Sequence, residues 1–145
     1  IIRPPLIYGP GVKGNLLSII KAAKLRIPLP LKSASKNRRS LVSLENLSSL
    51  IKECITNPAA AGNAFFVKDQ LDLSTLEIVR LLTMNEGLSP ILFSVPEQLL
   101  RFLLFLLGRR SLSQRLFGNL IVDDTFTKKT LGWNPINSKV CCKQL

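Results

Sequence analysis

The sequence predicts a mixed α/β fold. Short apolar runs that end at Pro or Gly alternate with segments in which apolar residues recur at helical spacing. Hydrophobic residues make up 46% of the 145 residues and the mean hydropathy is +0.25, which excludes a disordered chain. No G-x-G-x-x-G motif opens a predicted helix, and strands and helices do not follow a regular repeat. The chain therefore does not encode a doubly wound six-stranded sheet with its own dinucleotide cradle.

The first predicted element is a strand within residues 1–11 that runs into a shaped loop. Its apolar run ends in two prolines, and the Gly-Pro-Gly at 9–11 forces a change of direction. Shaped loops at strand ends are common ligand sites in α/β proteins. Tyr8 is not expected to be a catalytic acid, because the residue four positions later is Val12 and not a lysine that would lower the pKa of the phenol.

Three helices are predicted in the first 85 residues. The first covers 15–26, with Asn15 as its N-cap, and the second runs from Ser43 to about Thr56. The third begins at Ser74, where Glu77 completes a capping box, and ends near residue 84. The second helix is predicted to bury one apolar face, formed by Leu47, Leu50, Ile51, Cys54 and Ile55. Residues 27–31, 39–44 and 64–67 read as extended segments between these helices.

The remaining elements are a strand over 91–95, a Leu-rich helix that starts at Pro96, a short helix over 111–118, an extended segment 120–122 and a last helix over 123–131. The apolar run 99–108 is far shorter than the roughly 20 residues that a membrane span needs. It also contains Arg101, which favours a buried or surface-docking helix. Arg109 and Arg110 flank the run and keep membrane contact open as an alternative.

The net charge of +11 predicts an anionic partner: nucleic acid, a membrane surface or a phosphorylated ligand. The basic residues are spread along the sequence and cluster only at 36–39 and 109–110, which is a weak signal for nucleic acid. Cys54, Cys141 and Cys142 fit neither a zinc pattern nor a closed disulfide set, and no signal peptide is visible, so reduced thiols in the cytoplasm are expected. The sequence has no His and predicts no metal site.

Three segments resemble, in order, the C-terminal third of extended short-chain dehydrogenases/reductases. They are RPPLIYGPG at 3–11, RRSLVSLENL at 38–47 and DDTFTKKTLGWNP at 123–135. The resemblance is to the NAD-dependent sugar-nucleotide epimerases and dehydratases, and most of all to the UDP-hexose 4-epimerase branch. It implies the substrate-binding portion of a Rossmann-type enzyme without its dinucleotide-binding half. In these terms residues 1–11 form part of the cleft wall, 12–135 the substrate domain and 136–145 a tail.

The resemblance also implies site residues. Those expected to line the nicotinamide and sugar end of the cleft are Pro4, Pro5 and Leu6; those expected to bind the nucleotide are Asn15, Leu16, Leu29, Pro30, Leu31, Arg39 and Arg115. Many epimerases have Asn where this chain has Leu6. A helix N-terminus and an Arg fork both suit phosphate on chemical grounds.

Each of these residues also has a structural interpretation. Asn15 is equally a helix cap, Arg39 a solvated charge, and 29–31 a core strand. Trp133 is predicted to be a packing residue. Asp123 and Asp124 are predicted to cap the last helix.

The resemblance further implies an enzyme that uses NAD to oxidise a sugar hydroxyl and returns the hydride to the other face, with a UDP-hexose substrate and a homodimeric complete form. The Tyr-x-x-x-Lys motif and the glycine-rich cradle would lie before Ile1. No catalytic residue, tight NAD binding or turnover is therefore expected of this chain, and neither a nucleic-acid partner nor a membrane partner is expected. The alternatives are a stand-alone basic module that binds nucleic acid or an anionic membrane, and a degenerate remnant that binds a partner. The sugar, the nucleotide and the reaction type stay open.

Overall fold

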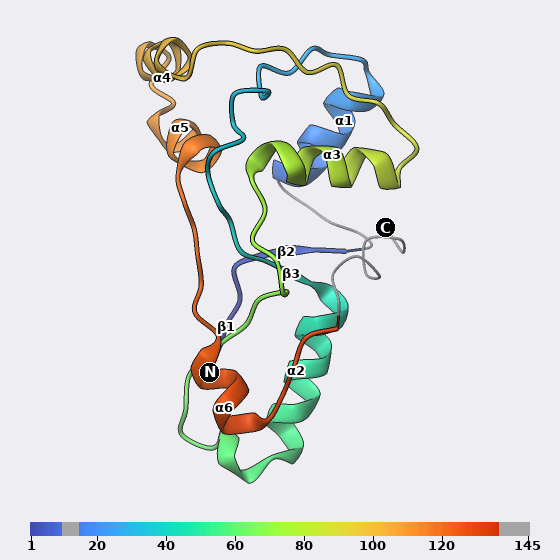
Figure 1. The fold of residues 1–145 in the computed structure, drawn as a ribbon, viewed down its shortest axis with the longest axis vertical. Helices are drawn as coiled ribbons and strands as arrows, with labels where there is room; N and C mark the ends of the chain where they lie inside the picture. Colours follow the sequence, from blue (N-terminus) through green and yellow to red (C-terminus); the bar gives the residue numbers. More distant parts are fainter. Residues whose placement is uncertain (10–14, 137–145) are drawn as a thin grey trace. The chain divides into compact units, whose positions relative to one another are not determined.

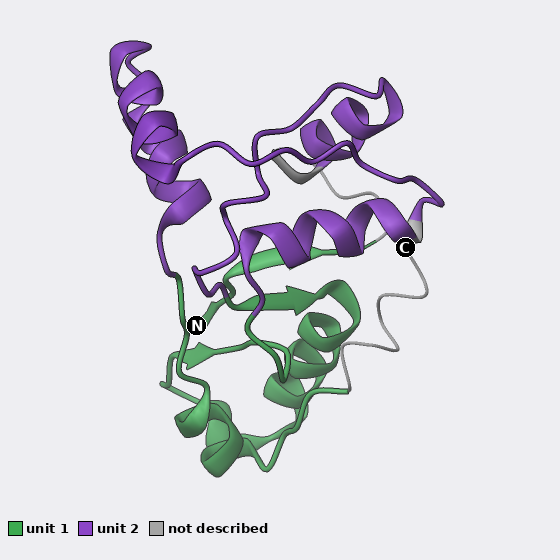
Figure 2. Ribbon diagram, turned by 45° about the horizontal axis from the view of Figure 1, so that its top comes forward, with its two compact units in different colours: residues 1–12, 40–72, 120–145 green, residues 13–39, 73–119 purple. Residues whose placement is uncertain are grey.

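A computed structural model describes residues 1–9 and 15–136 and has a mixed α/β fold (Figure 1). The chain divides into two compact units (Figure 2). Unit 1 comprises residues 1–12, 40–72 and 120–145, and unit 2 comprises 13–39 and 73–119. Residues of the segment 12–135 occur in both units. Each unit is assembled from segments that are far apart in the sequence.

Unit 1 contains the four short strands, which form two parallel pairs. β1 (Ile2–Arg3) pairs with β4 (Phe65–Phe66), and β2 (Leu6–Tyr8) pairs with β3 (Leu41–Ser43). In the second pair Leu6 lies opposite Leu41. Parallel strands require long connections, and here the connections leave the unit and return to it.

The single strand predicted at the start of the chain is two strands. Pro4 and Pro5 separate β1 from β2, because a residue without an N–H cannot continue the ladder. Gly9 follows β2 with φ 153°, and a Cβ at this position would lie 2.9 Å from the Cβ of Leu44. Glycine therefore allows the chain to pass close to the start of the next helix. The rest of the predicted turn, at 10–11, lies outside the described residues.

The helical elements of unit 1 are α2 (Leu44–Thr56), the 3₁₀ turn η1 (Pro58–Ala60) and α6 (Thr125–Leu131). The hydrophobic core of the unit consists of Val42, Leu47, Leu50, Phe65, Val67, Leu131 and Trp133. Trp133 is buried as predicted, and its Nε1 donates to Ser49 Oγ over 3.2 Å. The predicted buried face of α2 is only partly correct, because Ile51 and Ile55 are 43% and 79% exposed.

Unit 2 is mainly helical. Its helices are α1 (Asn15–Lys24), α3 (Thr75–Asn85), α4 (Glu97–Leu106) and α5 (Arg110–Phe117). α1 packs against α3, and α4 packs against α5. The buried apolar residues of the unit are Ile20, Ala23, Leu31, Ala34, Leu76, Ile78, Val79, Leu82 and Phe117. The predicted capping box of Ser74 and Glu77 is present at the start of α3.

Two predicted strands of unit 2 are reduced to a single parallel bridge between Leu29 and Leu92. Leu29 N donates to Ile91 O over 2.9 Å, and Phe93 N donates to Leu29 O over 3.1 Å. The prolines around Leu29 remove the donors that a longer ladder would need. Pro96 is the N-cap of α4 and not its first helical residue. None of the helices in the described ranges is long and apolar enough to cross a bilayer.

Candidate functional site

The backbone of Arg39 is fixed by an antiparallel bridge to Leu73. Arg39 N donates to Leu73 O over 2.8 Å, and Leu73 N donates back over 3.0 Å. Two reciprocal bonds hold one residue firmly, because both of its backbone groups are satisfied by the same partner. The Arg39 side chain therefore extends from a rigid backbone, which a recognition residue requires.

The Arg39 side chain extends to the end of α5. Its Nη1 donates to the carbonyl oxygen of Arg115 over 2.6 Å and to that of Gly118 over 3.3 Å. Burial, and then the nearby positive charge of Arg115, lower the pKa of the Arg39 guanidinium from its ordinary value. The structure thus brings together two of the predicted phosphate-binding residues, which are 76 positions apart in the sequence.

Gly118 has a steric role in this arrangement. A Cβ at this position would overlap the carbonyl oxygen of Gln114, so only glycine lets the chain leave α5 by this path. The Gly118 N–H donates to that same oxygen over 2.8 Å and caps the helix. The direction of the Gly118 carbonyl, which accepts from Arg39, therefore depends on a turn that a side chain at position 118 would disrupt.

Asn37 and Thr75 link the segment before Arg39 to α3 and α5. Asn37 is buried, and its Nδ2 donates to Thr75 Oγ1 over 2.8 Å while its Oδ1 accepts from Thr75 N over 3.1 Å. Thr75 Oγ1 in turn donates to Leu116 O over 2.8 Å. Sequence reasoning missed both residues, because their partners lie 38 and 41 positions away and leave no local pattern.

The other predicted nucleotide contacts of unit 2 lie on two elements. Leu31 is buried in the core of the unit, whereas Leu29 and Pro30 are half-buried. Asn15 and Leu16 form the first residues of α1. Residues 29–33 are held by the segment 91–95, through the bridge at Leu29 and a bond from Ser33 Oγ to Val95 O over 2.5 Å. Contact with a base would therefore rely on the backbone of this segment and on its two half-buried side chains.

The predicted cleft-wall residues belong to unit 1. Pro4 is exposed and borders an apolar cavity of about 480 Å³, whereas Pro5 and Leu6 are half-buried. The cavity is lined by Ile1, Ile2, Pro4, Leu47, Ile51, Cys54, Ile55, Ala60 and Phe65. Burial raises the pKa of the Cys54 thiol, so this group remains neutral. The cavity can pack apolar groups, and none of the side chains that line it carries a positive charge for a phosphate.

Tyr8 is a structural residue in unit 1. It is buried, and its hydroxyl donates to Asp69 Oδ2 over 2.5 Å. Asp69 Oδ1 accepts from Asn46 Nδ2 over 2.7 Å and from Ser43 N over 3.2 Å. A buried carboxylate with three donors is the hub of a satisfied polar network.

The arrangement around Arg39 can bind an anion but offers little for acid–base chemistry. Two guanidinium-bearing residues meet there, and no group of three or more potential ligands that could hold a metal ion occurs among the described residues. Arg has five N–H donors, and anchoring through Nη1 leaves those on Nε and Nη2 for an oxygen acceptor. Binding of a phosphate or diphosphate is the chemistry that these groups support best.

Known proteins resemble the chain in sequence and in fold. No protein-family model matches the chain. It is 44% identical over 137 residues to a UDP-glucose 4-epimerase from Vibrio cholerae, an alignment that covers 93% of this chain and 41% of that protein. The chain thus spans about two-fifths of the length of the curated relative it matches.

Solved structures share the fold. A UDP-glucose 4-epimerase from Thermotoga maritima, solved with UDP-glucose, matches 99% of this chain and 43% of its own length, with a TM-score of 0.60 and 15% identity. The enzyme WbmG from Bordetella bronchiseptica, solved with NAD, matches 99% of this chain and 41% of its own length, with a TM-score of 0.66 and 15% identity.

Proposed function

Because the chain belongs in sequence and fold to the extended short-chain dehydrogenases/reductases of the sugar-nucleotide epimerase type, we propose that it is the substrate-binding part of a UDP-hexose 4-epimerase. The observation that carries the proposal is the bond from the Arg39 guanidinium to the Arg115 carbonyl, which brings the two arginine residues together at the end of α5. The Arg39 guanidinium is anchored on two backbone carbonyls, and its pKa is lowered first by burial and then by the positive charge of Arg115. Two like charges held together are stabilised by a shared anion.

In this proposal the diphosphate of the nucleotide lies between the two arginines. Arg39 binds a phosphate oxygen through donors that its carbonyl contacts do not use. Arg115, whose side chain is exposed, supplies a second positive charge. The N–H groups at the start of α1 and the half-buried segment 29–30 serve the second phosphate and the base.

Isothermal titration of the chain with UDP, with UMP and with inorganic phosphate tests the proposal. We expect UDP to bind more tightly than either of the other two ligands. Arg39→Ala should weaken UDP binding by about 10–100-fold, because a charge-assisted hydrogen bond contributes about 1.5–3 kcal/mol. Arg39→Lys should lose much of this affinity as well, since a lysine keeps the charge but not the fork.

Arg80→Ala is the matched control. Arg80 is exposed on α3 in the same unit, so the variant removes one positive charge without touching the arginine pair. It should leave the affinity for UDP within about twofold of the unsubstituted chain. Equal losses in Arg39→Ala and Arg80→Ala would mean that UDP responds only to net charge, and the proposed site would be wrong.

The proposal extends to the cofactor of the complete enzyme. Pro4, Pro5 and Leu6 would face the nicotinamide and sugar, and NAD would accept the hydride from the sugar and return it. This chain contains neither the glycine-rich cradle nor a Tyr-x-x-x-Lys motif. We therefore expect no interconversion of UDP-glucose and UDP-galactose when the purified chain is mixed with NAD, and measurable turnover would contradict this part of the proposal.

A further inference from the structure

The apolar side chains of α4 are exposed to solvent. No residue of this helix is buried, and its large hydrophobic side chains, with Leu107 that follows them, are 44–70% exposed at Leu99, Phe102, Leu103, Phe105, Leu106 and Leu107. α4 lies next to α5 (Figure 1), but that contact leaves five of its apolar side chains at least 44% exposed. Single exposed leucines are ordinary, whereas five such residues on one short helix and a sixth directly after it indicate an interaction surface.

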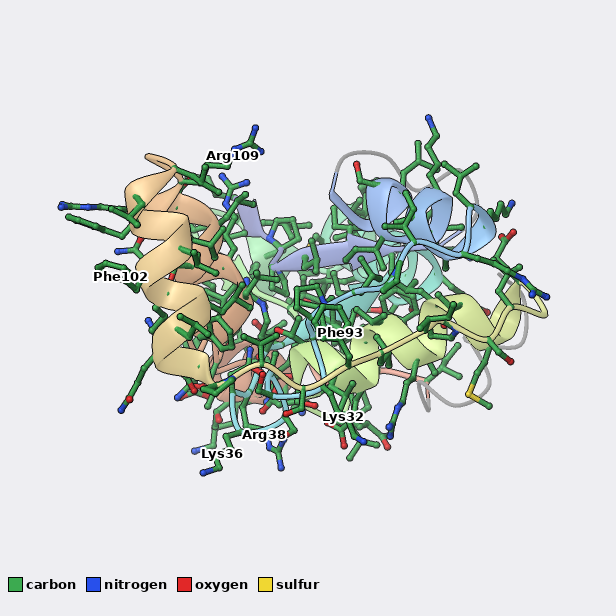
Figure 3. All side chains as sticks on the ribbon, turned by 90° about the horizontal axis from the view of Figure 1, so that it is seen from above. Lys32, Lys36, Arg38, Phe93, Phe102 and Arg109 are labelled. Atoms are coloured by element: carbon green, nitrogen blue, oxygen red, sulfur yellow. The ribbon has the colours of Figure 1, made fainter. Side chains whose placement is uncertain are left out.

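Basic residues border this apolar surface. Arg109 and Arg110 follow the helix after the turn at Gly108, and the Arg110 guanidinium lies 4.2 Å from the centre of the Phe105 ring. The acidic residue of α4, Glu97, is paired with Arg101 over 2.7 Å at the opposite end of the helix. Figure 3 shows Phe102 pointing outward from α4 and Arg109 beyond its C-terminal end. Apolar and positive groups thus meet at the α4–α5 turn.

The charge of the chain is concentrated in the same unit. Unit 2 contains 13 of the 20 Lys and Arg residues but three of the nine Asp and Glu residues, which gives it a formal net charge of +10 of the total of +11. The basic residues are spread along the sequence, but most of them therefore belong to one unit of the fold. Lys36 and Arg38 point outward from the segment before Arg39 (Figure 3).

We propose that α4 docks unit 2 on an anionic phospholipid membrane. The apolar side chains enter the boundary between headgroups and acyl chains, and Arg109 and Arg110 contact lipid phosphates. A helix of ten residues is about 15 Å long, which is half of a hydrocarbon core, so α4 lies in the membrane surface and does not cross it. Nucleic acid would match the charge but leave the apolar side chains without a role, because its affinity comes from phosphate contacts.

Co-sedimentation of the full chain with vesicles tests the proposal. One set contains phosphatidylcholine with about one-third phosphatidylglycerol, and the other contains phosphatidylcholine alone. We expect binding to the anionic vesicles at least about tenfold tighter than to the neutral ones. Leu106→Asp with Leu107→Asp should reduce anionic-vesicle binding at least about tenfold, and Arg109→Glu with Arg110→Glu should do so as well.

Leu25→Asp is the matched control, because Leu25 is 74% exposed in unit 2 but follows α1. It should bind anionic vesicles like the unsubstituted chain. All substituted positions are exposed, and circular dichroism verifies that each variant is folded. Loss of binding in Leu25→Asp equal to that in the α4 variants would overturn the assignment to α4.

A fluorescent reporter separates insertion from surface adsorption. Phe102→Trp places an indole on α4, and the background of the buried Trp133 is subtracted using the unsubstituted chain. We expect a blue shift and quenching by lipids brominated on the acyl chain. Absence of vesicle binding, or binding to anionic vesicles without either optical change and with no loss in the Leu106→Asp and Leu107→Asp variant, would overturn the proposal.

Discussion

The two units differ in how they distribute charge. Unit 1 holds seven basic and six acidic residues, for a net charge of +1, whereas unit 2 holds 13 and three, for a net charge of +10. The acidic residues of unit 1 serve its own structure: Asp69 is a buried hub, and Asp72 pairs with Lys68 over 2.9 Å. Unit 2 has few such partners for its basic residues. Nearly all of the net charge therefore belongs to unit 2. An anionic ligand would be attracted to that unit more strongly than to unit 1.

The units also differ in what holds them together. Unit 1 has a defined core that includes Trp133, and a carboxylate that satisfies three donors inside it. Unit 2 also buries apolar side chains, such as Val79 and Leu82, but its buried polar contacts lie at the start of α3, in the capping box of Ser74 and the bond of Asn37 with Thr75. Trp133 is the one tryptophan of the sequence, so its fluorescence reports on unit 1 alone, while far-ultraviolet circular dichroism reports on both units.

The largest effect is expected from Asp69→Ala in unit 1. The substitution leaves the Tyr8 hydroxyl, the Ser43 N–H and the Asn46 amide without their common acceptor. Buried donors without acceptors are costly, so the free energy of unfolding should fall by about 3–5 kcal/mol. The measurement is a urea titration followed by Trp133 fluorescence.

Two further variants serve as a milder substitution and as a control. Tyr8→Phe removes one donor and leaves the other two in place, so it should cost only about 1 kcal/mol. Asp123→Asn changes an exposed carboxylate of the same unit while keeping an oxygen acceptor for Thr125, and it should shift the transition little. If Asp69→Ala and Asp123→Asn gave equal shifts, the buried network would not be what holds unit 1.

A smaller effect, confined to unit 2, is expected from Gly118→Ala. The added Cβ overlaps the Gln114 carbonyl, so the end of α5 must shift and the carbonyl that binds Arg39 moves with it. Overpacking of this kind costs about 1–3 kcal/mol. Circular dichroism should show an earlier loss of helix, while the Trp133 transition stays in place. A Trp133 transition that moved by the same amount would show that the two units unfold together.

Local features of the fold could be predicted from the sequence. The capping box at Ser74, the entry of α2 at Ser43 and the burial of Trp133 follow from residue type and short spacing. The helical spacing of α2 also predicts an apolar face. It could not predict that Ile51 and Ile55 remain exposed, since periodicity does not specify what covers a face.

Long-range features could not be predicted. The bond from Tyr8 to Asp69 spans 61 positions, and that from Arg39 to the Arg115 carbonyl spans 76. Arg39 and Arg115 were expected to bind phosphate from a family resemblance, but nothing in their spacing indicates that they meet. The concentration of charge in unit 2 depends on the chain leaving and re-entering each unit, which composition alone does not reveal.

The smallest expected effect is a pH-dependent change in the stability of unit 2. The Glu77 carboxylate accepts from Ser74 N and Ser74 Oγ, both over 2.7 Å, and these bonds, more than the nearby Arg38, hold its pKa below the usual range. A pKa that is lower in the folded state adds stability above the unfolded pKa and loses it as the pH falls through the folded pKa. Because this side chain is half exposed, Glu77→Gln should cost only a few tenths of a kcal/mol at neutral pH.

This difference should shrink as the pH falls through the lowered pKa of the Glu77 carboxyl, because the carboxyl of the unsubstituted chain becomes protonated there. Urea titrations at a series of pH values from neutral to acidic, followed by circular dichroism, measure the change. Since Glu77 lies in unit 2, the Trp133 transition should be the same in variant and unsubstituted chain at each pH. A difference that persisted at low pH would show that the charge of Glu77 is not what stabilises the start of α3.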